Sequence, residues 1–176
     1  MPRCPRDCWL NDPGMHFLPG NRIELLTNGE EYFPALLAAI DAASFEVCLE
    51  TYIFEDDVTG RRVVAALERA AQRGVSVRIM VDGFGASAFV GIFGERLAAA
   101  GAEVRVYRPE VARFRLRRHR LRRLHRKLAT IDARIAFVGG INIIDDMDTP
   151  GQIPPRHDYA VRVEGPLLGA IHGSME

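Results

Sequence analysis

Three side chains that can bind a phosphate group occur close together in the second half of the sequence. His125 and Lys127 are two residues apart, and Asn142 follows the pair Gly139-Gly140. Side chains two residues apart on a strand point to the same face of a sheet, and a glycine lets the backbone approach a ligand closely. An imidazole, an ammonium and an amide around one point would bind an oxyanion such as a phosphodiester.

A β-hairpin is the expected support for these residues. Residues 128–131 and 135–138 are short apolar runs, and the polar residues 132–134 separate them. An ordinary hairpin with a few polar residues at its ends is the alternative interpretation. The composition speaks against it, because Lys127 is the only lysine among 23 lysine and arginine residues. A compact ammonium and a planar guanidinium are not interchangeable in a small pocket, so the position indicates a specific need for lysine.

The pattern from His125 to Asn142 reads H-x-K-x4-D-x6-G-G-x-N. It resembles the HKD signature of the phospholipase D superfamily over the whole signature. The surrounding sequence is similar to bacterial cardiolipin synthases, most of all to the B type, over residues 28–35, 49–54, 124–142 and 158–166. The resemblance runs from about residue 21 to residue 166, and it covers only the amino-terminal half of such a synthase.

The resemblance implies a role for each residue of the motif. His125 would attack phosphorus and form a phosphohistidine, which suits an imidazole with an ordinary pKa of about 6.5. Lys127 and Asn142 would hold the non-bridging oxygens, so that neither a metal nor a cofactor is required. Asp158 aligns with the acid that hydrogen-bonds the far nitrogen of this histidine, although a solvated acid at a strand end is the alternative. Asp132 belongs to the catalytic signature, and its expected role is mainly structural, in pairing and turning the hairpin.

Arg126 and Gly140 are the two residues that we expect to contact the substrate beside the catalytic group. Family members need two HKD motifs for a complete site, and no second H-x-K-x4-D occurs in the sequence. His119 precedes Arg120 and Leu121, and neither of the later histidines has a lysine two residues on. The chain is therefore expected either to pair as a homodimer, as the short single-motif nucleases of the superfamily do, or to require a missing carboxyl-terminal half.

A basic segment precedes the motif. Residues 105–127 hold eleven basic residues and one acid, although the net charge of the chain is zero. The segment could be a solvated loop, a nucleic-acid patch or a surface for anionic phospholipid headgroups. We favour the membrane, because aromatic residues for base stacking are sparse and leucines are interleaved. Nucleic acid is thus an unlikely partner. The predicted membrane-binding residues are Arg115, Arg117, Arg118, Arg120, Arg122 and Arg123.

Composition and length indicate one folded domain. The chain has 176 residues, of which 48% are hydrophobic and 26% charged. Residues 1–20 read as a loose leader, and residues 21–176 as the domain with one HKD motif.

The three cysteines do not suggest a disulfide framework, and no apolar run approaches the roughly 18 residues of a membrane span. No signal peptide is evident. We expect a peripheral protein at the cytoplasmic face of the cell membrane.

The pattern of apolar residues predicts an α/β fold. Strands are expected at residues 22–26, 45–54, 75–82, 103–107, 128–131, 135–138 and 158–164, and helices at residues 30–43, 59–73 and 92–100, with a loop at 83–88. Gly165-Pro166 would open a further helix. Together with the resemblance, this implies a mixed β-sheet with helices on both faces, the phospholipase D-like sandwich.

Three functions fit these observations. The first is a cardiolipin synthase-type phosphatidyl transferase of phospholipid biosynthesis, which would act on phosphatidylglycerol or a similar lipid through a phosphohistidine. The second is a metal-independent phosphodiesterase or nuclease of the single-motif dimeric type. The third is an inactive half-domain or a membrane-binding module.

Overall fold

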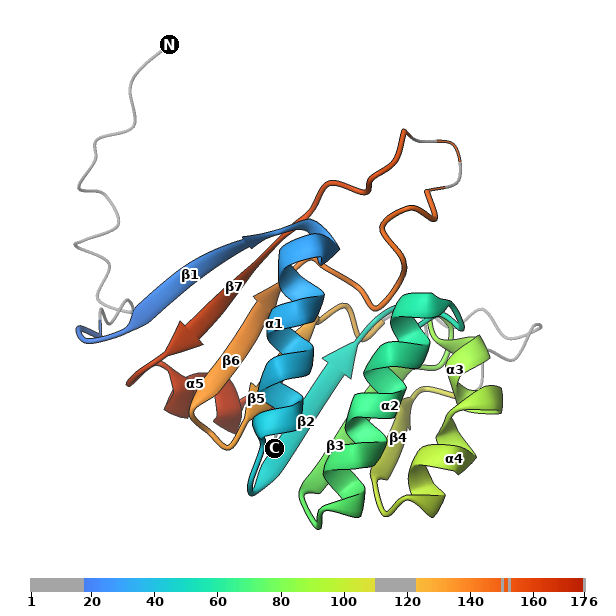
Figure 1. Cartoon of the computed structure of the whole chain (residues 1–176), viewed down its shortest axis with the longest axis horizontal. Coiled ribbons are helices and arrows are strands. Elements are labelled where there is room, and N and C mark those ends of the chain that lie inside the picture. Colours follow the sequence, from blue (N-terminus) through green and yellow to red (C-terminus); the bar gives the residue numbers. More distant parts are fainter. Residues whose placement is uncertain (1–17, 110–122, 150, 152, 176) are drawn as a thin grey trace.

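The computed structural model describes residues 18–109, 123–149, 151 and 153–175. Its centre is a seven-stranded sheet in the order β1-β7-β6-β5-β2-β3-β4 (Figure 1). In chain order the strands are β1 (Arg22–Thr27), β2 (Glu46–Thr51), β3 (Ser76–Asp82), β4 (Glu103–Tyr107), β5 (Leu128–Ile131), β6 (Ile135–Gly139) and β7 (Tyr159–Glu164). Most of the predicted leader lies outside the described residues, as do 110–122 of the basic segment.

The sheet is mixed, as the resemblance implied. Strands β2, β3 and β4 are parallel, whereas β1, β7, β6, β5 and β2 pair antiparallel to their neighbours. The parallel strands are connected by helices, because a parallel connection must cross the sheet. Helix α2 (Val58–Gln72) connects β2 to β3, and α3 (Ser87–Ile92) and α4 (Gly94–Ala99) connect β3 to β4.

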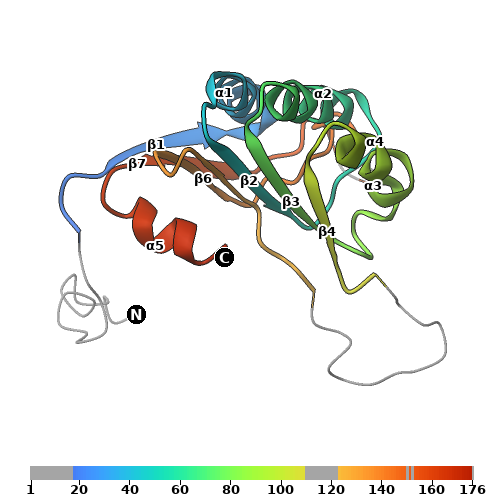
Figure 2. The same cartoon turned by 90° about the horizontal axis from the view of Figure 1, so that it is seen from below.

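Helices cover both faces of the sheet, again as predicted. Figure 2 shows α1 (Asn28–Ala42) and α2 to α4 on one face and α5 (Leu168–Gly173) on the other. The main core fills the space between the sheet and the first four helices. A much smaller cluster of Ala136, Val163 and Leu168 lies under α5. Side chains alternate between the two faces along a strand. Ala136 and Val163 therefore point to the face covered by α5, and their neighbours along β6 and β7 point to the opposite face.

The second helix begins at Val58, one residue before the predicted start at residue 59. Asp57 is its N-cap, and one carboxylate oxygen accepts a hydrogen bond of 2.7 Å from the backbone N–H of Gly60. The other oxygen accepts from the N–H of Asp145, in the loop after β6. A single carboxylate thus caps the helix and fixes this loop to the end of the sheet.

Three predicted boundaries were wrong. The strand expected at 45–54 ends at Thr51. The expected single helix at 92–100 is two short helices, and α3 begins at Ser87, inside the expected loop at 83–88. The chain turns at Phe93, which is buried against Phe54 and Phe89, so tertiary packing overrides local helical periodicity here. No helix in the described part of the chain is long and apolar enough to cross a membrane.

Candidate active site

The register between β2 and β5 sets the position of the motif. Leu128, the first residue of β5, pairs with Glu50 near the end of β2, and the two strands are antiparallel. Residues that precede Leu128 therefore lie beside residues that follow Glu50. This pairing brings His125 and Lys127 to Tyr52, which is distant in the sequence and directly follows β2.

Lys127 is buried directly before β5, which is an interior strand of the sheet. Its side chain is 8% exposed, and its ammonium donates a hydrogen bond of 3.1 Å to the backbone carbonyl of His125. The same ammonium lies over the ring of Tyr52, 5.2 Å from its centroid. Burial lowers the pKa of Lys127 below the usual value of a lysine, and the Asp158 carboxylate opposes this effect. A positive charge is thus held in a partly dry site.

His125 is exposed, which leaves its imidazole open to a substrate. Its ring also contacts Tyr52, with centroids 5.1 Å apart and an angle of 43° between the planes. His125 and Lys127 therefore contact the same aromatic ring. The structure brings this predicted pair together.

Asn142 comes to the same place from β6. Its Oδ1 accepts a hydrogen bond of 3.0 Å from the backbone N–H of Ile53, the residue after Tyr52. The next residue, Ile143, donates its N–H to the Ile53 carbonyl at 3.1 Å. Because Oδ1 is occupied, the donor Nδ2 is the end of the amide that suits an anionic oxygen. The imidazole, the ammonium and the amide thus converge on residues 52 and 53.

Gly140 is needed for packing beside Asp158. A Cβ at Gly140 would overlap the Asp158 carboxylate, so only glycine allows this close approach. The backbone of Asp158 is fixed from both sides: its N–H donates to Asn28 Oδ1 at 3.0 Å, and its carbonyl accepts from Asn28 N–H at 2.8 Å. The contact of Gly140 with a substrate stays a prediction.

The expected hydrogen bond between Asp158 and His125 is not formed within the described residues. Asp158 Oδ1 instead accepts from the backbone N–H of Tyr159 at 2.7 Å. Its carboxylate is close enough to raise the pKa of Lys127. In this structure Asp158 therefore interacts electrostatically with the Lys127 ammonium.

Asp132 lies at the opposite end of β5 from His125. It and Ala133 are the first two residues of the three-residue turn between β5 and β6, and both have positive φ, 52° and 47°. The Asp132 carboxylate accepts hydrogen bonds from the backbone N–H groups of Ser44, Phe45 and Glu46, at 2.9, 2.7 and 2.9 Å. Burial raises its pKa, but these bonds lower it by more, so the net pKa lies below the usual value. Its contacts are those of a structural residue.

Arg126 points away from its two neighbours in the motif. Its Nε lies 2.7 Å from Glu50 Oε2, its Nη2 donates to Oε1 at 3.0 Å, and its Nη1 donates to the carbonyl of Ser174 at the end of α5. Glu50 itself is only 3% exposed. The predicted substrate contact of Arg126 would require this pair to rearrange.

Asp82 is a site residue that the sequence did not single out. It ends β3, is fully buried, and accepts from the backbone N–H of Leu124 at 2.8 Å through Oδ2. Its Oδ1 accepts from the N–H groups of Phe84 and Gly85, at 2.9 and 3.2 Å. In the sequence, Asp82 could have been recognised as a polar residue at the end of an apolar strand. Asp82 anchors the chain directly before His125.

Of the predicted membrane-binding arginines, only Arg123 lies within the described residues. Its guanidinium carbon is 4.9 Å from the ring centroid of the exposed Phe84. Arg115, Arg117, Arg118, Arg120 and Arg122 lie outside the described residues.

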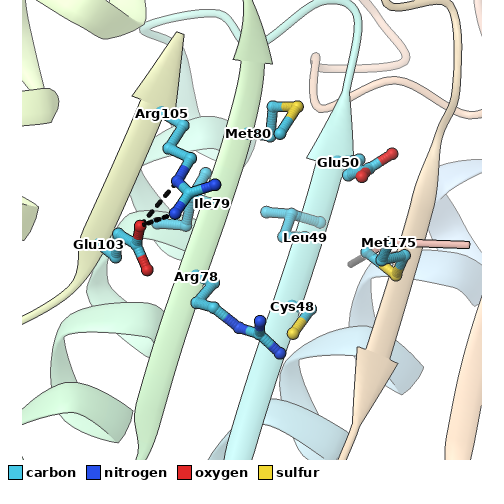
Figure 3. A pocket seen from close by; sticks show the side chains of 9 residues that line it. All are labelled: Cys48, Leu49, Glu50, Arg78, Ile79, Met80, Glu103, Arg105 and Met175. Carbon is cyan, nitrogen blue, oxygen red and sulfur yellow. Dashed lines mark hydrogen bonds and ion pairs between the residues drawn. The ribbon is translucent and has the colours of Figure 1, made fainter. Parts of the chain in front are cut away.

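A pocket of about 50 Å³ lies away from the motif, over β2, β3 and β4. Figure 3 shows its polar lining, including Arg78 and the ion pair of Arg105 with Glu103, on the face turned away from α2. Glu50 lines this pocket and also pairs with Arg126 of the motif. In the described part of the chain, no three His, Cys, Asp or Glu side chains are placed to hold a metal ion. Metal-independent chemistry stays a prediction.

Comparison with known proteins places this geometry in context. The family described as "Cardiolipin synthase, PLD-like domain" matches residues 36–147. The chain is 46% identical over 153 residues to cardiolipin synthase B of Escherichia coli K12, and 44% identical over 152 residues to that of Shigella flexneri. Each alignment covers 86% of the chain and 37% of the relative, so the chain spans just over a third of the length of these synthases.

Two solved structures share the fold at low sequence identity. Nuc, a phospholipase D family member from Salmonella typhimurium, superposes with a TM-score of 0.63 at 20% identity, over 89% of this chain and 92% of Nuc. NucT from Helicobacter pylori gives a TM-score of 0.61 at 16% identity, over 88% and 91%.

Proposed function

The chain belongs to the phospholipase D-like family, and from this membership we propose that it carries the nucleophilic half of a cardiolipin synthase-type phosphatidyl transferase site. One observation carries the proposal: the Lys127 ammonium and the His125 imidazole share the ring of Tyr52, while Asn142 is bound to Ile53. These are the groups that a phosphodiester displacement requires.

The proposed reaction has two displacements at one phosphorus atom. In the first, a ring nitrogen of His125 forms a bond to phosphorus, and the bond from phosphorus to the donor's alcohol oxygen breaks. A general acid protonates this oxygen. In the second, the hydroxyl of an acceptor lipid attacks, the P–N bond breaks, and the proton of the hydroxyl returns to the same acid–base group. Lys127 and Asn142 would stabilise the charge on the non-bridging oxygens in both steps.

The general acid must come from outside the described site, because the sequence holds one HKD motif. Either a second copy of the chain or a carboxyl-terminal half would supply it. The second source is supported by the relatives, of which the chain covers 37%.

We propose phosphatidylglycerol or a similar anionic phospholipid as substrate, and a peripheral position at the cytoplasmic face of the membrane. The basic segment between β4 and β5 would bind the headgroups.

A metal-independent phosphodiesterase or nuclease of the dimeric single-motif type is the alternative. The near-complete coverage of Nuc and NucT supports it, since it indicates that family members of about this length exist. The sequence similarity to the B-type synthases, at 44% and 46% identity, favours the transferase. An inactive half-domain is the third alternative.

Incubation with phosphatidylglycerol vesicles in excess EDTA tests the proposal. The chain would be used alone and mixed with the carboxyl-terminal half of a B-type synthase. We expect an acid-labile phosphatidyl adduct on His125 and the formation of cardiolipin, both lost in His125→Ala. The matched control is His157→Ala, which removes an exposed histidine that contacts Tyr159.

Each other outcome argues against the transferase. Free phosphatidate without cardiolipin would indicate a hydrolase, and His125-dependent cleavage of DNA would indicate the nuclease. The absence of any adduct, even with the complementary half present, would support the inactive half-domain. Gel filtration of the chain alone decides between a homodimer and a monomer.

A further inference from the structure

Tyr52 is the residue around which the predicted catalytic groups gather. It follows β2 directly and is half-buried. Its ring lies 5.1 Å from the His125 ring and 5.2 Å from the Lys127 ammonium nitrogen. A Cβ at Gly85 would overlap the Tyr52 carbonyl and crowd its ring, so Gly85 leaves the room that the ring occupies.

The backbone around Tyr52 is held by several hydrogen bonds. Thr51 Oγ1 donates to the carbonyl of Ile53 at 2.9 Å, and that carbonyl also accepts from the N–H of Ile143. The Ile53 N–H donates to Asn142. The position of the Tyr52 ring is therefore fixed by the segment that also orients the third catalytic group.

We propose that Tyr52 is a positioning residue, whose aromatic ring holds the Lys127 ammonium and the His125 imidazole so that both face one phosphoryl position. The kinetic part of this proposal rests on the proposed function. The part that concerns Lys127 rests only on the contacts of the ring with the ammonium.

The physical reason lies in the burial of Lys127. Lys127 is only 8% exposed, so its side chain has lost much of its contact with water, and its ammonium donates one hydrogen bond, to the His125 carbonyl. The Asp158 carboxylate also raises the pKa of Lys127, but burial outweighs it, so the ring of Tyr52 is a further source of stabilisation for the ammonium. The electron-rich face of an aromatic ring attracts a cation, and this attraction is strongest where water is excluded. An aliphatic side chain of similar size would keep the site dry but remove the attraction. The hydroxyl of Tyr52 plays no part in this role.

The sequence offers a direct probe, because Lys127 is its only lysine. Protein expressed with 13Cε,15Nζ-labelled lysine gives a single side-chain NMR signal. Its titration reports the pKa of Lys127 without substrate or turnover. Three variants would be compared with the unchanged protein: Tyr52→Leu, Tyr52→Phe and Tyr107→Leu. Tyr107 is the matched control, since its ring lies beside a different cation, Arg108, at 5.4 Å.

We expect Tyr52→Leu to lower the pKa of Lys127, and Tyr52→Phe and Tyr107→Leu to leave it unchanged. In turnover with the complementary half, Tyr52→Leu should lower kcat by about tenfold with a much smaller change in KM, and Tyr52→Phe should restore most of the loss. A lysine titration in Tyr52→Leu that matches the unchanged protein would overturn the proposal.

Two further results are informative. If Tyr52→Leu fails to fold, as seen by circular dichroism, Tyr52→Met provides another non-aromatic side chain, for which the same lowered pKa is expected and an unchanged one overturns the proposal. If the chain transfers no phosphatidyl group, the proposed function fails, but the titration still decides whether the ring stabilises the ammonium. A loss in Tyr52→Phe equal to that in Tyr52→Leu would show that the hydroxyl matters and would contradict the assigned role.

Discussion

The replacement of Asp82 by asparagine tests how the chain before His125 is anchored. Asp82 is fully buried, and its two carboxylate oxygens accept three backbone N–H groups from two segments, residues 84–85 and Leu124. Asparagine has nearly the same shape but only one acceptor oxygen. If this oxygen keeps the bonds to Phe84 and Gly85, the amide NH2 faces the N–H of Leu124, and two donors oppose each other.

The magnitude follows from the number and kind of bonds. A hydrogen bond to a charged group contributes about 1.5–3 kcal/mol, and Leu124 is buried, so little water replaces the lost acceptor. We expect Asp82→Asn to lower the free energy of unfolding by about 2–3 kcal/mol. For a chain of this size this corresponds to a decrease in Tm of roughly 4–12 °C.

Urea unfolding followed by circular dichroism measures this change. The matched control is Asp41→Asn, because Asp41 also loses a charged partner, Arg69, but at the surface, where an ion pair contributes at most about 1 kcal/mol. An unfolding free energy of Asp82→Asn within about 0.5 kcal/mol of the unchanged protein, at an equal m value, would refute the assignment of Asp82 as an anchor.

Two further predictions concern the hydrogen bonds of Asp132 and the ion pair of Arg126 with Glu50. Asp132→Ala should lower the free energy of unfolding by about 1–3 kcal/mol at pH 7, because three backbone donors lose their acceptor. The pKa of Asp132 is lowered in the folded state, so its contribution is present above about pH 4 and is lost as the pH falls through the lowered pKa. Urea titrations at pH 3 to 7 should therefore show a weaker pH dependence in Asp132→Ala than in the unchanged protein. Arg126→Ala should destabilise by about 1–2 kcal/mol, less than the loss for a fully buried pair, because Arg126 is 46% exposed while Glu50 is buried. Adding Glu50→Gln should restore part of this loss in a double-mutant cycle, and strict additivity of the two changes would contradict the pairing.

The helices and strands followed from the sequence wherever apolar periodicity was strong. The strand at Glu103–Tyr107 was predicted with its bounds, and the second helix and the hairpin of β5 and β6 lie within one or two residues of the prediction. The division between α3 and α4 was not predicted, because the burial of Phe93 between Phe54 and Phe89 depends on contacts distant in the sequence.

The sequence by itself determined the motif, because His125, Lys127 and Asn142 stand at fixed spacings directly before and after the hairpin of β5 and β6. Only the tertiary structure decided what surrounds them. Asp82 is 42 residues from Leu124, and Glu50 is 76 residues from Arg126. The central role of Tyr52 likewise depends on the antiparallel pairing of β2 with β5. Such contacts arise from the order and register of strands, and no local pattern in a single chain specifies which distant residue will stand opposite another.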